Sequence, residues 1–310
     1  MNSESKYVLG VEVGGSHIST ALIDAQGKMV ESSFRNLKVD SGKDKEAILD
    51  KWAMAMNHSI ARVGQENLKG ISFAMPGPFN YLDGVALFKG NSKYEALCGI
   101  SIPEELTGRL RIKKDVEMRF LNDATSFAVG AAWQGKAKDT RKALFITLGT
   151  GCGSAFIENG LPIVHRADVP SEGCLWHLPF RDTRVDDYFS SRWFVDTARK
   201  KYDLDITGVK SLARAGRKHQ HVQDIFNEFG ANLGEMLKPW VEKFSPEMVL
   251  FGGSIAKAFD LFSPKLKEQL NQFNLSLEFT ENSEKEALIG STRLFEEDFW
   301  KLVRAQLPAL

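Results

Sequence analysis

The sequence predicts an α/β protein built from two related lobes, and three observations support this prediction. The chain has 310 residues, 43% of them hydrophobic, which is enough for two domains or one large α/β domain. Strand-like apolar runs alternate with segments of helical period. The stretches "VLGVEVGGSHISTALID" (8–24) and "ALFITLGTGCGSAFIEN" (143–159) share one layout of strand, glycine turn, second strand and acid-bearing turn. This echo indicates two lobes, each opening with a β-hairpin whose turn faces one cleft.

The first half of the chain begins as an antiparallel meander. Its predicted strands are bounded by turn residues and span 7–13, 17–24, 29–35, 70–78 and 118–123. A helix is expected over 44–63, because apolar residues recur there on one face, at Ile48, Trp52, Met56, Ile60 and Val63. Further helices are expected near 103–109 and over 124–135, and the rest of 79–115 is irregular.

The second half opens with a strand–turn–strand unit over 143–160. Residues 161–192 are typical of loops around an active site, and 192–244 has a helical pattern. The remaining expected elements are a strand at 247–254, a helix at 255–271, a strand at 275–280 and a closing helix at 286–304.

Charge and cysteine content narrow the classes of partner. Forty basic residues balance forty acidic ones, so no global field favours nucleic acid or an anionic membrane, although "RLRIKK" (109–114) is a local basic patch. No apolar run reaches the roughly 18–20 residues of a membrane span, and the start "MNSESKY" lacks a secretion-signal pattern. Cys98, Cys152 and Cys174 stand far apart, which favours a reducing compartment. We expect a soluble cytoplasmic protein without nucleic-acid or membrane partners.

Glu12 is a carboxylate inside the first apolar run, two residues before a glycine pair. Two interpretations stay open: a solvated strand face, or a turn that holds a charged ligand. Glycine lets backbone N–H groups converge on an anion, and a neighbouring hydroxyl adds a donor. A plain hairpin turn also explains one such motif, but three of them end apolar strands, at 14–16, 149–153 and 252–254. None is a P-loop, because GxxxxGK[ST] does not occur.

Asp123 lies between a predicted strand and a predicted helix in "NDATSFAVGAA". The position suits a helix N-cap, a role that Asp fills well. It also suits a general base at the mouth of the sheet, which would accept a hydroxyl proton as that oxygen attacks a phosphoryl group. Both roles stay open from the residues alone.

Six segments, taken in order, resemble the ROK family of sugar kinases, repressors and relatives. They are "VEVGGSH", "AMPGP", "FLNDATSFAVGAAWQG", "LGTGCGSAFIENG", "PEMVLFGGS" and "ALIGSTRLF". The resemblance implies the two-lobed, actin-like ATPase/hexokinase fold, with ribonuclease H-like lobes and a cleft between them. Residues 1–121, with a C-terminal helix at about 296–310, would form the smaller lobe, which carries the first phosphate loop. Residues 122–295 would form the larger lobe, with the second phosphate loop and the nucleotide-side turn.

The resemblance also implies ATP-dependent phosphorylation of a hexose or amino sugar, with Mg²⁺ as the metal ion. Asp123 would be the catalytic base. Sugar contacts would come from Asn91, Asn122 and the corner Pro76, Gly77 and Pro78. Phosphate and nucleotide contacts would come from the three glycine turns, at Gly14, Gly15, Ser16, Thr150, Gly151, Gly153, Gly252 and Gly253.

The chain departs from the family pattern at several sites. Glu12 stands where the family usually has Asp; it keeps the charge that lies near the phosphates, and we assign it as the Mg²⁺ contact. The family's Glu-x-Gly-His segment is replaced by "SEGCLWHLP", in which Glu172 and His177 would still contact sugar. His177 also suits a structural role among Leu and Trp. Asp186 or Asp187 resembles a sugar-binding Glu of the family. The family's usual cluster of a His with closely spaced cysteines is missing, so we expect no zinc site.

Two functions remain as hypotheses, a sugar kinase and a non-catalytic sugar- or nucleotide-binding relative that acts as a sensor. The departures at Glu12 and 171–187 motivate the second. A nucleic-acid-binding regulator fits less well, because the net charge is zero and the first strand starts at about residue 7, which leaves no room for the N-terminal helix-turn-helix of the family's repressors. The resemblance also implies a homodimer.

Overall fold

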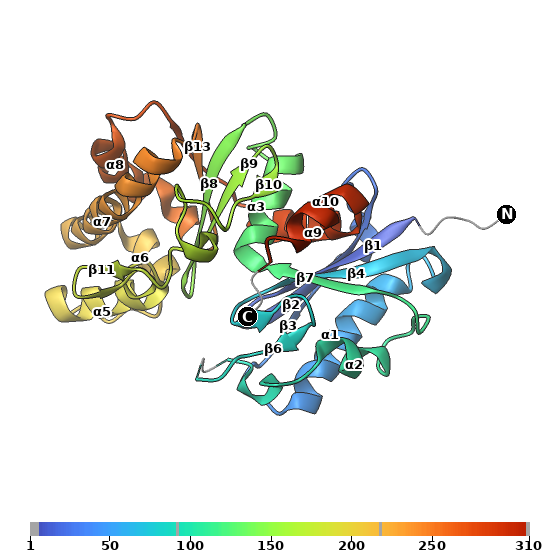
Figure 1. Ribbon diagram of the computed structural model, residues 1–310. Coiled ribbons are helices and arrows are strands. Elements are labelled where there is room, and N and C mark those ends of the chain that lie inside the picture. Colours follow the sequence, from blue (N-terminus) through green and yellow to red (C-terminus); the bar gives the residue numbers. More distant parts are fainter. Residues whose placement is uncertain (1–5, 91–92, 217–218, 308–310) are drawn as a thin grey trace. The chain divides into compact units, whose positions relative to one another are not determined.

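The computed structural model describes residues 6–90, 93–216 and 219–307, and the chain divides into two compact units (Figure 1). Unit 1 comprises residues 1–138 and 284–310, and unit 2 comprises residues 139–283. The family resemblance predicts lobe boundaries at 121/122 and 295/296. The bounds of these units differ from them, and the lobe boundaries stay a prediction.

Unit 1 contains a five-stranded sheet with the order β3-β2-β1-β4-β7. Its centre is β1 (Tyr7–Val13), which is antiparallel to β2 (His17–Asp24) and parallel to β4 (Leu68–Met75). The outer strands are β3 (Arg35–Lys38), antiparallel to β2, and β7 (Met118–Asn122), parallel to β4. The predicted hairpin of 7–13 and 17–24 is therefore confirmed.

Helices cover both faces of this sheet (Figure 1). On one face lies α1 (Lys45–Ile60), whose buried Ile48, Trp52 and Met56 confirm the predicted apolar face. On the other face lies α9 (Ser283–Thr292), where Leu288 and Ile289 pack against Ala21 and Ile23 of β2. The other elements of unit 1 are α2 (Ile102–Thr107), α3 (Asp123–Gln134), α10 (Glu297–Arg304), the short strands β5 (Phe79–Asn80) and β6 (Val85–Ala86), and single 3-10 turns at Glu31–Ser33, Gln65–Asn67, Glu95–Leu97 and Arg293–Phe295.

Unit 2 repeats the strand arrangement of unit 1. Its sheet has the order β10-β9-β8-β13-β14, in which β8 (Lys142–Leu148) is antiparallel to β9 (Cys152–Glu158) and parallel to β13 (Met248–Gly252). The outer strands are β10 (Leu161–Pro162) and β14 (Ser276–Phe279). Both sheets thus have two antiparallel and two parallel neighbour pairs in the same order. The second hairpin, predicted from the internal echo, is confirmed.

One apolar core joins the sheet of unit 2 to its helices. The longest of these is α7 (Gln220–Phe244), which packs against α8 (Phe259–Leu270). Phe229 of α7 lies on Phe262 of α8 at 5.3 Å between ring centroids. The predicted loop region 161–192 contains only short elements. The remaining elements of unit 2 are β11 (Pro179–Phe180), β12 (Thr183–Arg184), α4 (Val185–Tyr188), α5 (Ser191–Tyr202), α6 (Val209–Gly216) and 3-10 turns at Ser171–Gly173 and Ala256–Ala258.

Two sequence-based predictions of secondary structure are wrong. The strand expected over 29–35 is replaced by a 3-10 turn, because the Ser33 hydroxyl accepts a hydrogen bond from Leu22 N–H at 2.8 Å and donates to Val30 O. The closing helix expected over 286–304 is two helices, because Glu296 is extended (φ −84°, ψ 118°) and ends the first run. The turn between them packs the Phe295 ring onto Gly70, where a Cβ would collide with it.

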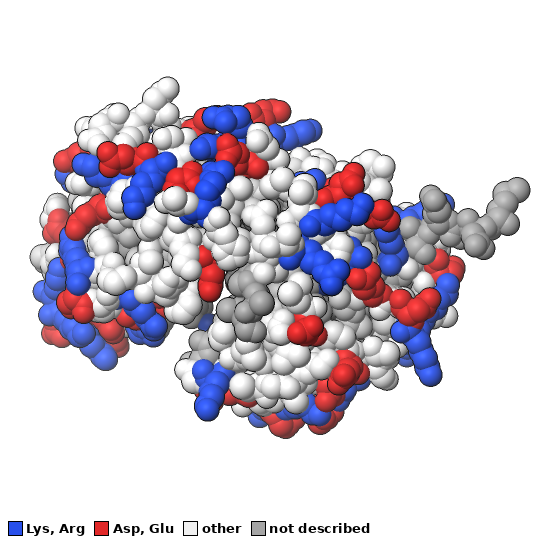
Figure 2. Space-filling view, viewed as in Figure 1, with Lys and Arg blue, Asp and Glu red and all other residues white. Residues whose placement is uncertain are grey.

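Basic and acidic side chains are intermixed on the surface of the described residues and do not form large patches of one sign. Figure 2 shows basic and acidic side chains interspersed on the visible face of each unit. Arg109, in the predicted basic patch, is paired with Glu46, Asp50 and Glu105. The three cysteines are free thiols. None of the helices in the described part of the chain combines the length and apolarity needed to cross a bilayer.

Candidate functional site

The first group of predicted site residues lies at one edge of the sheet of unit 1. The parallel register pairs Glu12 with Ala74, and Met75 with Asn122. The strands β1, β4 and β7 therefore end side by side. The same edge of the sheet carries the residues that follow these strands, namely the first glycine turn, the Pro76 corner and Asp123. In α/β sheets, ligands bind outside the carboxyl ends of parallel strands.

The first glycine turn is packed with side chains. Gly14 N–H donates to His17 O at 2.9 Å, and the Tyr94 hydroxyl donates to Gly14 O at 2.7 Å. Neither Gly14 nor Gly15 has a positive φ. A Cβ on Gly14 would collide with the His17 ring, and a Cβ on Gly15 would lie 2.5 Å from Lys93 Nζ. These glycines therefore make room for an imidazole and an ammonium group, which the sequence pattern did not show.

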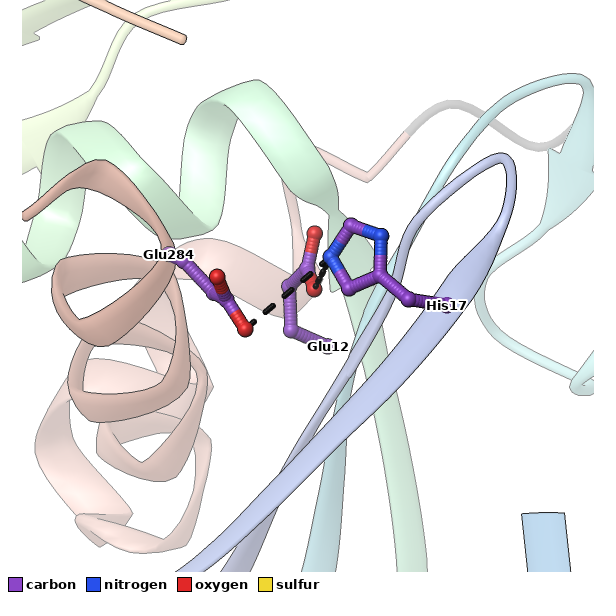
Figure 3. Close-up of side chains that lie close together, drawn as sticks. All are labelled: Glu12, His17 and Glu284. Carbon is purple, nitrogen blue, oxygen red and sulfur yellow. Dashed lines mark ion pairs between the residues drawn. The ribbon is translucent and has the colours of Figure 1, made fainter. Parts of the chain in front are cut away.

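Glu12 lies in a cluster with His17 and Glu284 (Figure 3). His17 Nε2 is 3.3 Å from Glu12 Oε2 and 3.9 Å from Glu284 Oε1. The Glu12 side chain is 14% exposed, so the solvated-face interpretation is wrong. Burial raises the pKa of Glu12, His17 opposes this rise, and the Glu284 and Asp123 carboxylates add to it. The contact with Glu12 in turn raises the pKa of His17.

Asp123 is the first residue of α3, and the N-cap role belongs to Asn122 instead. Asn122 Oδ1 accepts hydrogen bonds from Ala124 N–H at 3.0 Å and Thr125 N–H at 3.2 Å. Asp123 Oδ1 accepts from Ala124 N–H at 2.8 Å. Loss of water on burial raises the pKa of Asp123, against the lowering effects of the Ala124 amide and the Lys93 charge.

The Pro76–Pro78 corner is tied to Asn122 through Tyr81, a residue that the sequence pattern did not single out. The buried Tyr81 hydroxyl donates to Met75 O at 3.2 Å and accepts from Asn122 Nδ2 at 3.2 Å. Gly77 is exposed, and the Gly77–Pro78 peptide is cis. Tyr81 thus links Asn122 to Met75, the residue that precedes the predicted sugar-binding corner.

The second glycine turn, in unit 2, is fixed by hydrogen bonds from two helices. Asp186 Oδ1 accepts from Cys152 N–H at 2.8 Å, and a Cβ on Gly151 would collide with that oxygen. Ser191, at the start of α5, donates to Gly149 O from both its amide, at 2.8 Å, and its hydroxyl, at 2.9 Å. Thr150 remains exposed at the tip of the turn.

The third glycine turn follows β13 beside the second one. Gly252 pairs with Thr147 of β8 in the parallel register. Gly253 has φ 90°, and a Cβ there would collide with the Leu148 backbone. Its N–H donates to Ser283 Oγ at 3.1 Å. Only glycine suits this position, because an L side chain rarely adopts that backbone conformation.

The segment around Glu172 and His177 is docked on β9. Ser154 Oγ donates to Gly173 O at 3.2 Å and accepts from Leu175 N–H at 2.9 Å. Glu172 has φ 61°. Asp186 N–H donates to Trp176 O at 3.0 Å, and the Trp176 and His177 rings form an edge contact at 5.4 Å. The structure therefore brings His177 and Asp186 into one region of unit 2.

The predicted site residues are divided between the two units. Unit 1 holds the first glycine turn, the Pro76 corner, Asn122 and Asp123, and unit 2 holds the other two turns with Glu172, His177 and Asp186. Asn91 lies outside the described residues. The sequence pattern missed Lys93, Tyr94 and Glu284, since none stands in a motif and all meet the first turn only through the fold.

Within residues 6–90, 93–216 and 219–307, a single group of three or more His, Cys, Asp or Glu side chains could hold a metal ion, Glu12 with His17 and Glu284. Their ligand atoms lie within 4.8 Å of one another. No cysteine belongs to this group.

Comparison with known proteins identifies the family. A glucokinase of Thermotoga maritima is 24% identical over 288 residues, covering 85% of this chain and 86% of its own. A xylose repressor of Caldicellulosiruptor bescii is 21% identical over 328 residues, covering 96% and 80%. The solved structure of a ROK family glucokinase from Streptomyces griseus, in complex with glucose and AMPPNP, aligns with a TM-score of 0.75 at 18% identity, covering 94% and 99%.

The structural match confirms the predicted fold class, the two-lobed, actin-like α/β fold of the hexokinases. The sequence model of the ROK family matches residues 8–297, nearly the whole chain. Together with the order of the glycine turns and the Asn122–Asp123 helix start, this match establishes that the chain belongs to the ROK family.

Proposed function

We propose that this protein is an ATP-dependent sugar kinase, which transfers the γ-phosphoryl group to a hydroxyl of a hexose or amino sugar. The observation that carries the proposal is the placement of Asp123 as the first residue of α3, at the carboxyl edge of the sheet in unit 1. Asn122 takes over the helix cap, so the Asp123 carboxylate is not needed for that role. A carboxylate held at this edge supports a general-base function.

Asp123 would accept the proton of the attacking sugar hydroxyl. The Ala124 N–H holds Asp123 Oδ1 at 2.8 Å and so orients the carboxylate. The raised pKa of Asp123 makes it a stronger base than an ordinary Asp. Proton removal assists a transfer that depends mainly on positioning and on stabilisation of the phosphate charge.

The three glycine turns would bind the phosphates and the nucleotide, through Gly14, Gly15 and Ser16, Thr150, Gly151 and Gly153, and Gly252 and Gly253. Lys93 Nζ, which lies against Gly15, would add positive charge beside the first turn. The buried Glu12 Oε2 receives no hydrogen bond, so this oxygen fits a cation, and Glu12 would hold the Mg²⁺ that accompanies ATP. Bound Mg²⁺ would neutralise phosphate charge in the transition state.

Residues that would contact sugar are proposed in each unit separately. In unit 1, Asn122 Nδ2 is oriented by the Tyr81 hydroxyl next to the Pro76–Gly77 corner. In unit 2, Glu172, His177 and Asp186 would contribute, and Asn91 completes the proposed set. Asp186 also fixes the second turn, so sugar and phosphate binding would share this residue.

Release of ADP, measured across a panel of hexoses and amino sugars, tests this function. We expect at least one sugar to stimulate turnover, and Asp123→Asn to lower the stimulated rate about 10²–10⁴-fold, the usual range for a general base. Asp50→Asn is the matched control, since this exposed carboxylate on α1 is paired with Arg109 and belongs to no proposed site. If no sugar stimulates ADP release, or if Asp123→Asn matches wild type, the proposal is wrong.

The second candidate function is a sugar or nucleotide sensor without catalysis. It is favoured by the His17 ring beside Glu12 and by the resemblance to a xylose repressor at 21% identity. Titration calorimetry separates the two functions. Sugar binding in the presence of AMPPNP, without ADP production when ATP is supplied, would favour the sensor.

We also propose that the protein works as a cytoplasmic homodimer. The three free thiols support a reducing compartment. Light scattering coupled to size exclusion tests the dimer, since a monomer mass near 34.6 kDa would contradict it.

A further inference from the structure

The cluster of Glu12, His17 and Glu284 combines two carboxylates with an imidazole (Figure 3). The residues come from β1, from the start of β2 and from the first turn of α9, so the fold joins segments about 270 positions apart in the sequence. All three belong to unit 1. We infer that they form a binding site for a divalent first-row transition-metal ion, and that the site takes Zn²⁺ or Co²⁺ in preference to Mg²⁺.

The distances suit a metal ion. Ligand atoms about 2.1 Å from one ion in tetrahedral geometry lie about 3.4 Å apart. His17 Nε2 is 3.3 Å from Glu12 Oε2 and 3.9 Å from Glu284 Oε1, so small side-chain shifts bring all three atoms to one ion. Three protein ligands would leave the fourth position to water, as in zinc sites with an open coordination position.

The buried oxygen of Glu12 is a second observation. Glu12 Oε2 has almost no exposed surface and accepts no hydrogen bond of normal geometry, although it lies 3.3 Å from His17 Nε2. A buried polar atom without a partner is costly, and such atoms are rare in folded proteins. A cation at this oxygen would supply the missing interaction, and the neighbouring ligand atoms would complete its coordination.

The residues around the cluster hold the ligands in place. The Ser19 hydroxyl and Asn36 Nδ2 both donate to Glu284 Oε1, the latter at 3.0 Å, and Asn36 Nδ2 also donates to Ser19 Oγ at 2.7 Å. Gly14 leaves the space that the His17 ring occupies. Metal-binding side chains are commonly oriented by such outer partners.

The donor set decides which metal binds. Mg²⁺ prefers six oxygen ligands and keeps several waters, whereas imidazole suits Zn²⁺ and other transition metals. The two carboxylates balance the charge of a dication when His17 is neutral. The inference concerns the protein without nucleotide and does not depend on the proposed kinase activity, in which Glu12 would instead hold the Mg²⁺ that accompanies ATP. All ligands of the site inferred here are protein groups, so no nucleotide is needed.

The test uses full-length protein freed of metal by a chelator and contains no nucleotide. We expect calorimetry to show one Zn²⁺ bound per chain, and Mg²⁺ in hundredfold excess not to displace it. Co²⁺ should give visible d–d bands without a thiolate charge-transfer band, which separates this site from binding at the exposed Cys98. His17→Gln and Glu284→Gln should each weaken Zn²⁺ binding at least tenfold, and Asn36→Ala about tenfold through Glu284.

Matched controls are the exposed residues His165 and Glu281, whose changes to Gln should leave Zn²⁺ affinity unchanged. Circular dichroism shows whether each variant is folded. If a variant of one of the three ligands does not fold, Asn36→Ala tests the inference instead, because it leaves all three ligands intact. Absence of stoichiometric Zn²⁺ binding, unchanged affinity in folded His17→Gln, or a cobalt–thiolate band would each overturn the inference.

Discussion

The hairpin turns of the two units lie on sheets with the same strand order, yet different groups hold them. Around the first turn are the ionisable side chains of Glu12, His17 and Lys93, and the glycines leave space for the last two. Around the second turn, Asp186 and Ser191 form hydrogen bonds with the backbone. One hairpin framework can therefore serve either to gather charged groups or to fix backbone amides, and the side chains from distant segments decide which.

Glycine substitution should have the largest effect on stability, and this effect should differ between the turns. Gly253→Ala places a side chain at φ 90° and against the Leu148 backbone, so we expect a loss of about 3 kcal/mol in the free energy of unfolding. The atoms nearest to a Cβ on Gly14 belong to the His17 ring, a side chain that can rotate, so we expect Gly14→Ala to cost about 1 kcal/mol or less. Denaturant unfolding measures both, and equal losses would contradict the difference between the turns.

Glu12→Gln tests whether the first turn serves phosphoryl transfer. Gln keeps the size of the side chain but removes the charge, so we expect sugar-dependent ADP release to fall about a hundredfold, roughly 2.7 kcal/mol of transition-state stabilisation. The free energy of unfolding should change much less than this. A variant as active as wild type would show that the buried carboxylate has no part in catalysis.

Asp186→Ala tests the second turn. The change leaves the buried Cys152 N–H without its acceptor, so we expect the free energy of unfolding to fall by about 1.5 kcal/mol. Asp187→Ala, next in the chain, removes surface contacts, namely ion pairs with Arg184 and Arg192 and a hydrogen bond from the exposed Thr183 hydroxyl. It should cost about 0.5 kcal/mol or less. Equal losses in the two variants would mean that Asp186 does not fix the turn.

The sequence was informative where a pattern is local. The first hairpin and α1 follow from apolar periodicity and turn residues, and the observed bounds Tyr7–Val13, His17–Asp24 and Lys45–Ile60 agree with the prediction. The second hairpin could be predicted because it repeats the layout of the first. The general-base role of Asp123 came from the family resemblance. Its place at the same sheet edge as the first turn became visible only with the strand order of the structure.

What the sequence could not predict depends on contacts between distant segments. Glu284 reaches His17 only because α9 packs on β2, and no local pattern marks it. The N-cap could not be assigned either, since Asn122 and Asp123 are both good capping residues and only the backbone turn decides between them. The strand expected over 29–35 failed for a similar reason: the Ser33 side chain replaces a strand hydrogen bond.

The smallest expected effect concerns the pH dependence of stability. Because burial raises the pKa of Asp123 in the folded protein, its charged form opposes folding, and stability falls as pH rises from the ordinary Asp pKa through the folded value. Asp123→Asn should therefore raise the melting temperature slightly at pH 7 and not at pH 3. The Glu12 carboxylate opposes the Asp123 charge, whereas the Ala124 amide and Lys93 favour it, and these favourable contacts keep the gain small.

Melting curves of wild type, Asp123→Asn and Asp187→Asn between pH 3 and pH 8 measure this effect. A lower melting temperature for Asp123→Asn at every pH would mean that the carboxylate stabilises unit 1 rather than opposing its folding. A melting temperature that rises only near neutral pH would show that the charged Asp123 carboxylate lowers the stability of the wild-type protein. Retention of a destabilising carboxylate is what a catalytic role for Asp123 predicts.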